Sequence, residues 1–542
     1  MVSPFMHEDY HRKNPYGSSR LGSEQDAEVL STGRSPIARM VNTILRIQPQ
    51  EPVIIFGGAG SGKGANVGTY QFVHPATGSF FLLDMGGQYM STTWHYNLAL
   101  GRDAYALNVE EASTYPDINH PVNLWGILKD GRFLFDNARR IAAMALKDNE
   151  KGNNAWVRDD AVRWFTRLLI LLVLLQGRVT PKSFFALLNA MDADSNVIKE
   201  WGRRSEGLPY EVHTTIVEIY RTKATSEKQY SAVMGKLKSD LDWLSSPAVA
   251  ESVSGDEDYL EYLSDPNKKV GIYYALRSGS GEIMQSLTRM VVGIAMLHCM
   301  RNISGTLPTF YLEEAATCGG ADFIKQAVSE CRKYFHTILV YQSPGQVLHL
   351  FGRAGLQEIM DSCGMQLYLG GGIRSHETGK IVADSIGKST ILVDDPIAQL
   401  DRKFQAENVW REAIRCGADV MEVAESYHHL QEQSRQGRYT GRYTLDPAEL
   451  MRLKNEVLIL SPGSGIAPLL AQKLPAYWEN PLMAGRYAPD PLFPPLDRVT
   501  IKRRFWGKRT RKFIREAVPD HLAHLPNHSN GKIAYVQGYK TW

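Results

Sequence analysis

Val53-Ile54-Ile55-Phe56 runs directly into Gly57-Gly58-Ala59-Gly60-Ser61-Gly62-Lys63-Gly64-Ala65, so a short apolar segment typical of a buried strand continues into a glycine-rich loop. Glycines allow positive φ angles and direct successive N–H groups at one anion, and Lys63 adds a point charge there. The residues after the lysine would open a helix whose N-terminal dipole faces the same anion. The stretch therefore predicts a phosphate-binding loop.

The spacing Gly57-x4-Gly62-Lys63 fits the nucleotide-binding P-loop, with residues 57–65 as the binding residues. One position departs from that motif: Gly64 stands where a Ser or Thr usually binds Mg²⁺. The alternative is a glycine-rich turn between a strand and a helix that binds nothing. The order of strand, loop and lysine favours nucleotide binding.

Composition places few limits on function. A chain of 542 residues exceeds the size at which one core keeps growing, so two compact domains plus irregular ends are expected. The 61 basic and 58 acidic side chains nearly cancel, and the whole-molecule charge therefore identifies no partner. Five scattered cysteines and no apolar run beyond Leu168–Leu175 predict a cytoplasmic protein without a transmembrane helix.

The pattern of apolar residues predicts an α/β fold with a mostly parallel sheet, because buried strands alternate with helices. Strands are expected at 53–56, 79–84, 270–276, 309–312, 337–342, 366–369 and 390–393, and residues 36–47 are expected to form a helix. The predicted parts are a flexible lead (1–35), a nucleotide-binding domain (36–179 and 253–480), an all-helical insertion (180–252) and a basic C-terminal tail (481–542).

Glu313 and Glu314 directly follow the apolar run Phe310–Leu312, which places them at the carboxyl end of a strand. An NTPase needs one carboxylate for the waters around its metal and another to polarise the attacking water. We expect Glu313 to face Mg²⁺ and Glu314 to face the water. The alternative is a solvated pair of acids at a strand end.

Taken in order, these motifs resemble the soluble part of the TraG-like type IV secretion coupling proteins, the conjugative DNA-transfer ATPases. Further matching stretches are Phe81–Asp84, Pro121–Trp125, Trp156, Gln342, Asp361–Gly364 and Leu458–Gly463. The resemblance covers most of the chain. It implies a RecA-like P-loop NTPase with an inserted helical domain, ATP and Mg²⁺ as cofactors, and a homohexamer with nucleotide between subunits.

The resemblance also implies roles for single residues. Gln342 matches the glutamine that senses the γ-phosphate, and Arg332 matches the arginine finger that reaches a neighbouring subunit's nucleotide. Without the resemblance, Arg332 is equally well explained as a cation at a helix C-terminus. The chain departs from the family pattern at Glu313, usually Asp, and at Gly86 and Gln88, usually Lys and Glu.

Members of this family usually begin with transmembrane helices, so this chain is expected to dock in another way. Residues 502–515 are strongly basic with interleaved aromatic residues. They predict contact either with anionic lipid at the inner membrane or with nucleic acid, and the alternative is a solvated basic face.

The resulting prediction is an ATPase that recruits relaxase-bound single-stranded DNA, effector protein or both to a type IV secretion channel. Two alternatives stay open: a double-stranded DNA translocase of the same lineage, and a nucleotide-binding adaptor with little hydrolysis.

Overall fold

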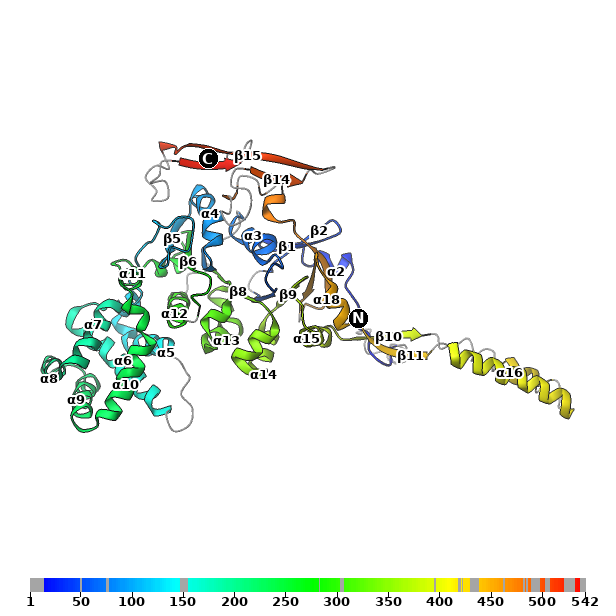
Figure 1. Ribbon diagram of the computed structural model, residues 1–542, viewed down its shortest axis with the longest axis horizontal. Helices are drawn as coiled ribbons and strands as arrows, with labels where there is room; N and C mark the ends of the chain where they lie inside the picture. Colours follow the sequence, from blue (N-terminus) through cyan, green and yellow to red (C-terminus); the bar gives the residue numbers. More distant parts are fainter. Residues whose placement is uncertain are drawn as a thin grey trace.

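The computed structural model describes residues 14–48, 51–74, 78–146, 155–281, 283–302, 307–393, 396–417, 421, 423–428, 438–461, 464–480, 483, 486–488, 498–502, 507–520 and 532–536. Within these residues, eleven strands form one sheet in the order β2-β1-β13-β12-β9-β3-β8-β7-β4-β6-β5 (Figure 1). The strands are β1 (Pro36–Met40), β2 (Thr43–Arg46), β3 (Val53–Phe56), β4 (Phe80–Met85), β5 (Asp103–Leu107), β6 (Val270–Leu276), β7 (Thr309–Leu312), β8 (His336–Tyr341), β9 (Met365–Leu369), β12 (Glu456–Leu460) and β13 (Leu469–Lys473).

The seven strands from β9 to β5 run parallel, and β12, β13, β1 and β2 extend the sheet antiparallel from β9. Parallel strands are buried on both faces and therefore appear as nearly continuous apolar runs. In β3, Ile54 and Phe56 enter the core on one face, while Val53 and Ile55 enter the core on the other. The predicted α/β fold with a mostly parallel sheet is confirmed.

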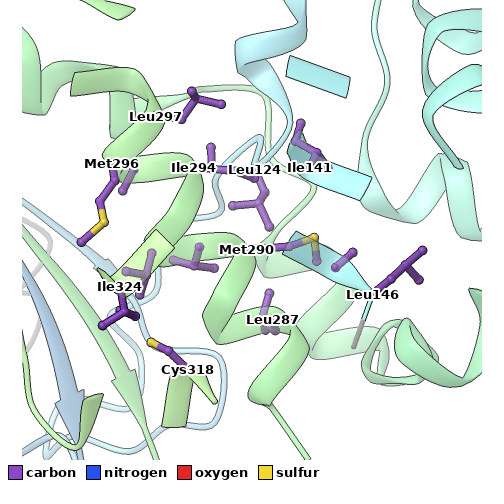
Figure 2. Packing of buried hydrophobic residues seen from close by; sticks show 14 of the residues in the cluster. Leu124, Ile141, Leu146, Leu287, Met290, Ile294, Met296, Leu297, Cys318 and Ile324 are labelled. Carbon is purple, nitrogen blue, oxygen red and sulfur yellow. The ribbon is translucent and has the colours of Figure 1, made fainter. Parts of the chain in front are cut away.

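Helices cover both faces of the sheet. One face carries α2 (Glu24–Glu28), α3 (Thr69–Phe72) and α4 (Gln88–Ala99), and the other carries α12 (Gln285–Arg301), α13 (Asp322–Ser329), α14 (Pro344–Ser362) and α15 (His376–Ile386). Figure 2 shows how α12 fills the core on this second face of the sheet: Leu287, Met290 and Ile294 lie between Ile141 on one side and Ile324 on the other. The sheet and α12 thus form a rigid base for the loops at the strand ends.

The predicted helix at 36–47 is wrong, because these residues form the hairpin β1–β2, which pairs with β13. Ile37 and Leu45 are buried, as a helical stripe would require, but Val41 and Ile44 are 63% and 40% exposed. Val41 has a φ of +50° in the turn between the strands. Pairing with a strand that is more than 400 residues away overrode the local helical spacing.

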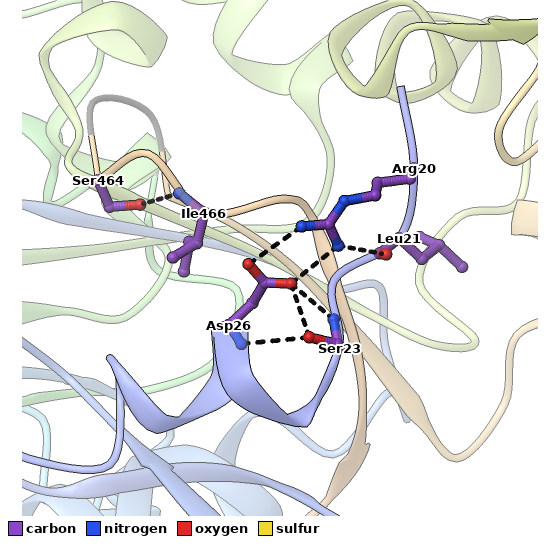
Figure 3. Close-up of polar contacts among 6 residues, drawn as sticks. All are labelled: Arg20, Leu21, Ser23, Asp26, Ser464 and Ile466. Carbon is purple, nitrogen blue, oxygen red and sulfur yellow. Dashed lines mark hydrogen bonds and ion pairs between the residues drawn. The ribbon is translucent and has the colours of Figure 1, made fainter. Parts of the chain in front are cut away.

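The segment expected as a flexible lead is folded from residue 14 onward. Ser23 caps α2, and Asp26 completes the capping box: the Asp26 carboxylate accepts from the Ser23 backbone N–H at 2.7 Å and pairs with Arg20 Nη1 at 2.9 Å (Figure 3). Ala27 and Leu30 are buried against the sheet. A capping box and two buried apolar side chains therefore hold a stretch whose polar composition suggested disorder. Residues 1–13 lie outside the described residues.

A helical body lies beside the sheet (Figure 1). Residues 180–252 contain α7 (Pro181–Ala193), α8 (Ser195–Arg204), α9 (Tyr210–Thr225), α10 (Glu227–Asp240) and α11 (Pro247–Ser252), the helical content expected there. The body also includes α6 (Ala155–Gln176), which follows α5 (Leu134–Ala145): the ring centroids of Phe165 and Phe184 are 4.4 Å apart, and those of Trp164 and Tyr230 6.0 Å. The helical body thus begins before residue 180.

No helix in the described part of the chain is by itself long and apolar enough to cross a membrane. The bent pair α6 and α7 meets the criteria of length and composition together, with 110° between the two helices. Both helices contribute to the core, where Leu168, Leu171 and Leu188 are fully buried.

The last third of the chain adds peripheral elements. The predicted strand at 390–393 exists as β10 (Lys388–Val393), but it pairs only with β11 (Arg438–Tyr443) outside the main sheet, and α16 (Pro396–Cys416) lies between them in sequence. The short α18 (Pro447–Arg452) precedes β12. Part of the predicted basic tail forms strands instead, in the three-stranded sheet β14 (Arg498–Lys502), β15 (Lys508–Ala517) and β16 (Lys532–Val536). The parts of that tail that lie outside the described residues are 481–482, 484–485, 489–497, 503–506, 521–531 and 537–542.

The buried His336 at the start of β8 predicts loss of stability in acid. Burial, aided by the charge of Arg34, lowers the pKa of His336 from 6.5 to about 3. The unfolded chain therefore binds a proton that the folded chain excludes, and the folded state loses stability as the pH falls from about 6.5 towards 3, by at most about 1.4 kcal/mol per pH unit from this residue. We expect His336→Leu to reduce the fall in thermal midpoint between pH 7.5 and 5.5.

The matched control is His376→Leu on α15, where the side chain is exposed. It should leave the pH dependence of the thermal midpoint as in the unmodified chain. Equal slopes for the His336 and His376 variants would contradict the prediction.

Candidate active site

The sheet order brings four predicted site segments to one edge. Strands β3, β8, β7 and β4 are neighbours, and their carboxyl ends lead into the glycine loop, Gln342, Glu313–Glu314 and the segment after Asp84. Phe56 pairs with Tyr341, and Leu312 pairs with both Leu339 and Leu83. Polar groups at the carboxyl ends of adjacent parallel strands are the usual makings of a ligand site in α/β folds.

The loop after β3 has the backbone that its glycines allow. Gly60 and Gly62 have φ angles of +76° and +89°, and a Cβ on Gly62 would lie 1.9 Å from Asn66 Oδ1. The loop continues into the π-helical turn η2 (Lys63–Gly68) and then α3. Lys63 Nζ lies over the loop and donates to the Gly57 carbonyl at 2.7 Å. The loop therefore closes on itself through the Lys63 side chain, and nucleotide binding by residues 57–65 stays a prediction.

Lys473 binds the backbone of this loop, a contact that the sequence did not indicate. Its Nζ donates to three backbone carbonyls, those of Ser61 at 2.7 Å, Gly370 at 2.8 Å and Lys454 at 2.7 Å. Burial lowers the pKa of this lysine. Because each ammonium proton has a carbonyl acceptor, Lys473 fastens the loop to the ends of β9, β12 and β13.

Arg374, after β9, is a second residue that sequence analysis missed. Its Nη2 donates to the Ala59 carbonyl at 2.6 Å, and its Nε donates to the Gly371 carbonyl at 3.2 Å. The side chain is exposed at the mouth of the loop. A lone arginine or lysine far along the chain carries no sequence signal of its own, so only the folded chain identifies either residue.

Glu314 and Gln342 form a direct pair. Gln342 Nε2 donates to both carboxylate oxygens of Glu314, at 2.8 and 3.1 Å, and the Gln342 backbone N–H donates to Gln346 Oε1 at 3.0 Å. Glu314 has φ +52° and ψ +52°, the left-handed conformation that residues other than glycine seldom adopt. Such strain is concentrated at functional sites, because the surrounding structure must hold it in place.

Glu313 lies close to two other acids, Asp84 and Glu314. Burial raises the pKa of Glu313 well above its usual range, the charges of Asp84 and Glu314 raise it further, and the charge of Lys63 opposes them. Asp84 is fully buried and accepts from the backbone N–H groups of Tyr89 and Met90, at 3.3 and 2.7 Å, at the start of α4. A cation placed here would relieve the cost of these buried acids.

The few side-chain oxygens at this place suit a cation whose other ligands are water molecules and substrate phosphates. A Cβ on Gly64 would lie 3.6 Å from both Gln88 Oε1 and the Tyr89 hydroxyl, so an amide oxygen is found beside the place of the absent Ser or Thr. No cluster of three His, Cys, Asp or Glu side chains arranged for a metal occurs in the residues that the structure describes. Mg²⁺ commonly keeps several waters and takes one or two carboxylates plus substrate phosphates, and the residues present fit that pattern.

An open cleft of about 780 Å³ begins at Glu313, Glu314 and Gln342. It continues past the loop after β6, at Ser278 and Gly279, to Gln285 of α12 and His349 of α14. The Glu314–Gln342 pair therefore has the glycine loop of the neighbouring strand β3 on one side and this cleft beside it.

Arg332 is the predicted site residue that the structure does not bring to the others. It lies exposed in the 3₁₀ turn Cys331–Lys333, just before β8 begins at His336. The site is at the other end of β8, and a six-residue strand spans about 20 Å. Within one chain Arg332 is thus on the opposite edge of the sheet, and its action on a neighbouring subunit stays a prediction.

The family model described as type IV secretory system conjugative DNA transfer matches residues 26–410. The chain is 25% identical over 205 residues to the type IV secretion system-coupling protein VirD4 of Bartonella henselae, and 24% identical over 205 residues to VirD4 of Bartonella quintana. Each match covers 37% of this chain and 31% of the relative, so the chain aligns with about a third of the length of these proteins.

Solved structures of a bacterial conjugative coupling protein share the fold. Unbound TrwBdeltaN70 has a TM-score of 0.57 at 13% identity, covering 85% of this chain and 94% of that chain. Plasmid coupling protein TrwB in complex with ADP and Mg²⁺ also has a TM-score of 0.57 at 13% identity, covering 86% of this chain and 96% of that chain. The predicted RecA-like P-loop NTPase fold is confirmed.

Proposed function

The chain belongs to the type IV secretory system conjugative DNA-transfer family, and from this premise we propose that it is a coupling protein that hydrolyses ATP to move macromolecular cargo. The observation that carries the proposal is the Glu314–Gln342 pair, held at 2.8 and 3.1 Å on the strands next to a P-loop. A carboxylate at this place can orient a water in line with a γ-phosphate.

The residues divide the work of phosphoryl transfer to water. Loop amides of residues 57–65 and the Lys63 ammonium bind and neutralise the phosphates, once Lys63 exchanges the Gly57 carbonyl for a phosphate oxygen. Glu314 orients the attacking water and takes up its proton. Gln342 donates a hydrogen bond to the Glu314 carboxylate and senses the presence of the γ-phosphate. When bound, Mg²⁺ supplies positive charge that offsets the charge developing on the phosphates. Glu313 is our candidate for the acid that faces the metal's water shell.

We propose relaxase-bound single-stranded DNA, effector protein or both as cargo, and a type IV secretion channel as the partner at the inner membrane. The printed names of the relatives, coupling proteins of secretion and conjugation, support this proposal. A homohexamer with Arg332 reaching the neighbouring nucleotide is part of the same proposal. The basic residues of 502–515 support contact of the C-terminal region with nucleic acid or anionic lipid.

Steady-state ATP hydrolysis by the purified chain tests the proposal, with and without single-stranded and double-stranded DNA and beside Lys63→Ala. We expect turnover that DNA stimulates and that Lys63→Ala abolishes. Stronger stimulation by duplex would favour the double-stranded DNA translocase. Tight ATP binding without turnover, with any DNA, would overturn the proposal and leave the nucleotide-binding adaptor.

Gln88 and Gly64 together predict how the chain depends on Mg²⁺. If the Gln88 amide oxygen serves in place of the usual hydroxyl, Gln88→Ala should raise the Mg²⁺ concentration for half-maximal ATP binding by about tenfold. Adding Gly64→Ser to that variant should restore most of the loss, because the new Cβ has 3.6 Å of clearance. A fluorescent ATP analogue titrated with Mg²⁺ measures both effects.

The matched control is Gln472→Ala, an exposed glutamine on β13 that should leave the Mg²⁺ titration unchanged. An unchanged titration for Gln88→Ala as well would remove Gln88 from the metal's surroundings.

A further inference from the structure

A second cleft, of about 690 Å³, lies between α5 and α6 on one side and the helices α12, α13 and α14 on the other. Its walls come from α5, α6, α12, the start of α13 and α14. It shares Gln285, His349 and Leu350 with the cleft that begins at Glu314, so the two adjoin. Three arginines line it: Arg140 on α5, Arg158 on α6 and Arg289 on α12.

Arg289 is a guanidinium group enclosed in protein. Arg289 is only 8% exposed. Its Nη2 donates to the Ala145 carbonyl at 3.2 Å and to Ser286 Oγ at 3.1 Å. Its Nε is buried and has no acceptor within the described residues. Burial lowers the pKa of Arg289, and the charge of Arg158 lowers it further, while the charge of Asp240 opposes the shift. Burying a guanidinium whose Nε has no acceptor is costly, and an anion in the cleft beside the same guanidinium would offset part of that cost.

Arg289 has no ion-pair partner among the described acids that line the cleft. Among the described residues, no carboxylate forms an ion pair with Arg140 or Arg289. One acid, Asp322, lines the cleft, and its carboxylate pairs with Lys325 at 2.9 Å. The cleft also receives the N-terminus of α13, at Ala321 and Asp322, whose dipole favours an anion.

We propose that this cleft binds a phosphate group, with Arg289 as the buried anchor and Arg140 and Arg158 as outer contacts. Guanidinium forks match the oxygens of phosphate, and a helix N-terminus adds backbone donors. Two sources carry this chemistry: inorganic phosphate leaving the adjoining cleft beside Glu314, which rests on the proposed function, and a phosphodiester of single-stranded nucleic acid, which does not.

Inorganic phosphate is the first probe, used on the full chain with Lys63→Ala so that the glycine loop does not contribute. Thermal unfolding is followed against phosphate at constant ionic strength. We expect a saturable rise in the thermal midpoint that weakens at least tenfold in apparent affinity when Arg140→Ser is added. The matched control is Arg139→Ser, an exposed neighbour on α5 that does not line the cleft.

A labelled single-stranded oligothymidine is the second probe, followed by fluorescence anisotropy at several salt concentrations. If a phosphodiester occupies the cleft, Arg140→Ser should lower the slope of log affinity against log salt by about one, relative to Arg139→Ser. An effect on phosphate alone identifies the free anion as the ligand, and an effect on the oligonucleotide alone identifies nucleic acid.

The proposal is overturned if Arg140→Ser and Arg139→Ser behave alike with both probes. Arg289→Gln should abolish the response that Arg140→Ser weakens, and Arg140 keeps the test decisive if that buried variant does not fold. Neither probe measures ATP turnover, so failure here is distinct from failure of the proposed hydrolysis.

Discussion

Exchange of Glu314 for glutamine is expected to lower steady-state ATP turnover by about 10²–10⁴-fold while ATP affinity stays within a few-fold. The variant keeps the shape of the side chain and an oxygen that can accept from Gln342 Nε2, now at 2.8 Å, so the strained backbone at φ +52° should persist. It removes the negative charge and one of the two acceptor oxygens, and with them the ability to take a proton from water. Turnover is measured under saturating ATP, and affinity by titration of a fluorescent analogue.

Glu313→Gln is the matched control one residue away. Burial and neighbouring acids raise the pKa of Glu313, so its loss should act through the Mg²⁺ dependence of ATP binding rather than through turnover at saturating Mg²⁺. If Glu314→Gln retains full turnover and Glu313→Gln loses it, the roles of the two acids are reversed.

Lys473→Met is expected to weaken ATP binding by tenfold or more, although Lys473 is not one of the proposed nucleotide-binding residues. The lysine makes three charge-assisted bonds to backbone carbonyls, and each such bond contributes about 1.5–3 kcal/mol. Without them the Ser61 carbonyl is free to turn, and the loop amides lose their common direction. Since about 1.4 kcal/mol corresponds to a tenfold change, loss of part of one bond's energy suffices.

Lys454→Met is the control for Lys473→Met. Lys454 offers only its backbone carbonyl to this cluster, and its exposed side chain should be dispensable. Circular dichroism and the thermal midpoint establish that both variants are folded. Equal ATP affinity in the two variants would show that the loop keeps its shape without Lys473.

The sequence placed candidate residues correctly in the fold where each one follows a strand. Lys63, Glu313, Glu314 and Gln342 each follow an apolar run within a few residues, and the structure places all four at one edge of the sheet. The same approach failed for residues 36–47, where a helical spacing of apolar residues belongs to a hairpin. Local periodicity could not reveal that β13 offers that hairpin a sheet edge.

Arg332 shows that a short distance along the sequence does not place a residue in the site. It follows Glu314 by 18 residues, yet the intervening helix α13 returns the chain to the opposite edge of the sheet before β8 begins. A parallel crossover always has this effect, because the next strand must start at the same edge as the last one. Proximity in sequence therefore said nothing about proximity to the site.

The sequence by itself determined the parallel α/β core, the glycine-rich loop after β3 and the position of the acids after β7, because each depends on residues that are near one another in the chain. Only the tertiary structure decided the support of the loop by Lys473, which is 412 residues from Ser61, and the gathering of Arg140, Arg158 and Arg289 around one cleft. The physical reason is that lone cations have no local pattern. Their roles come from the carbonyls and helix ends that folding brings to them.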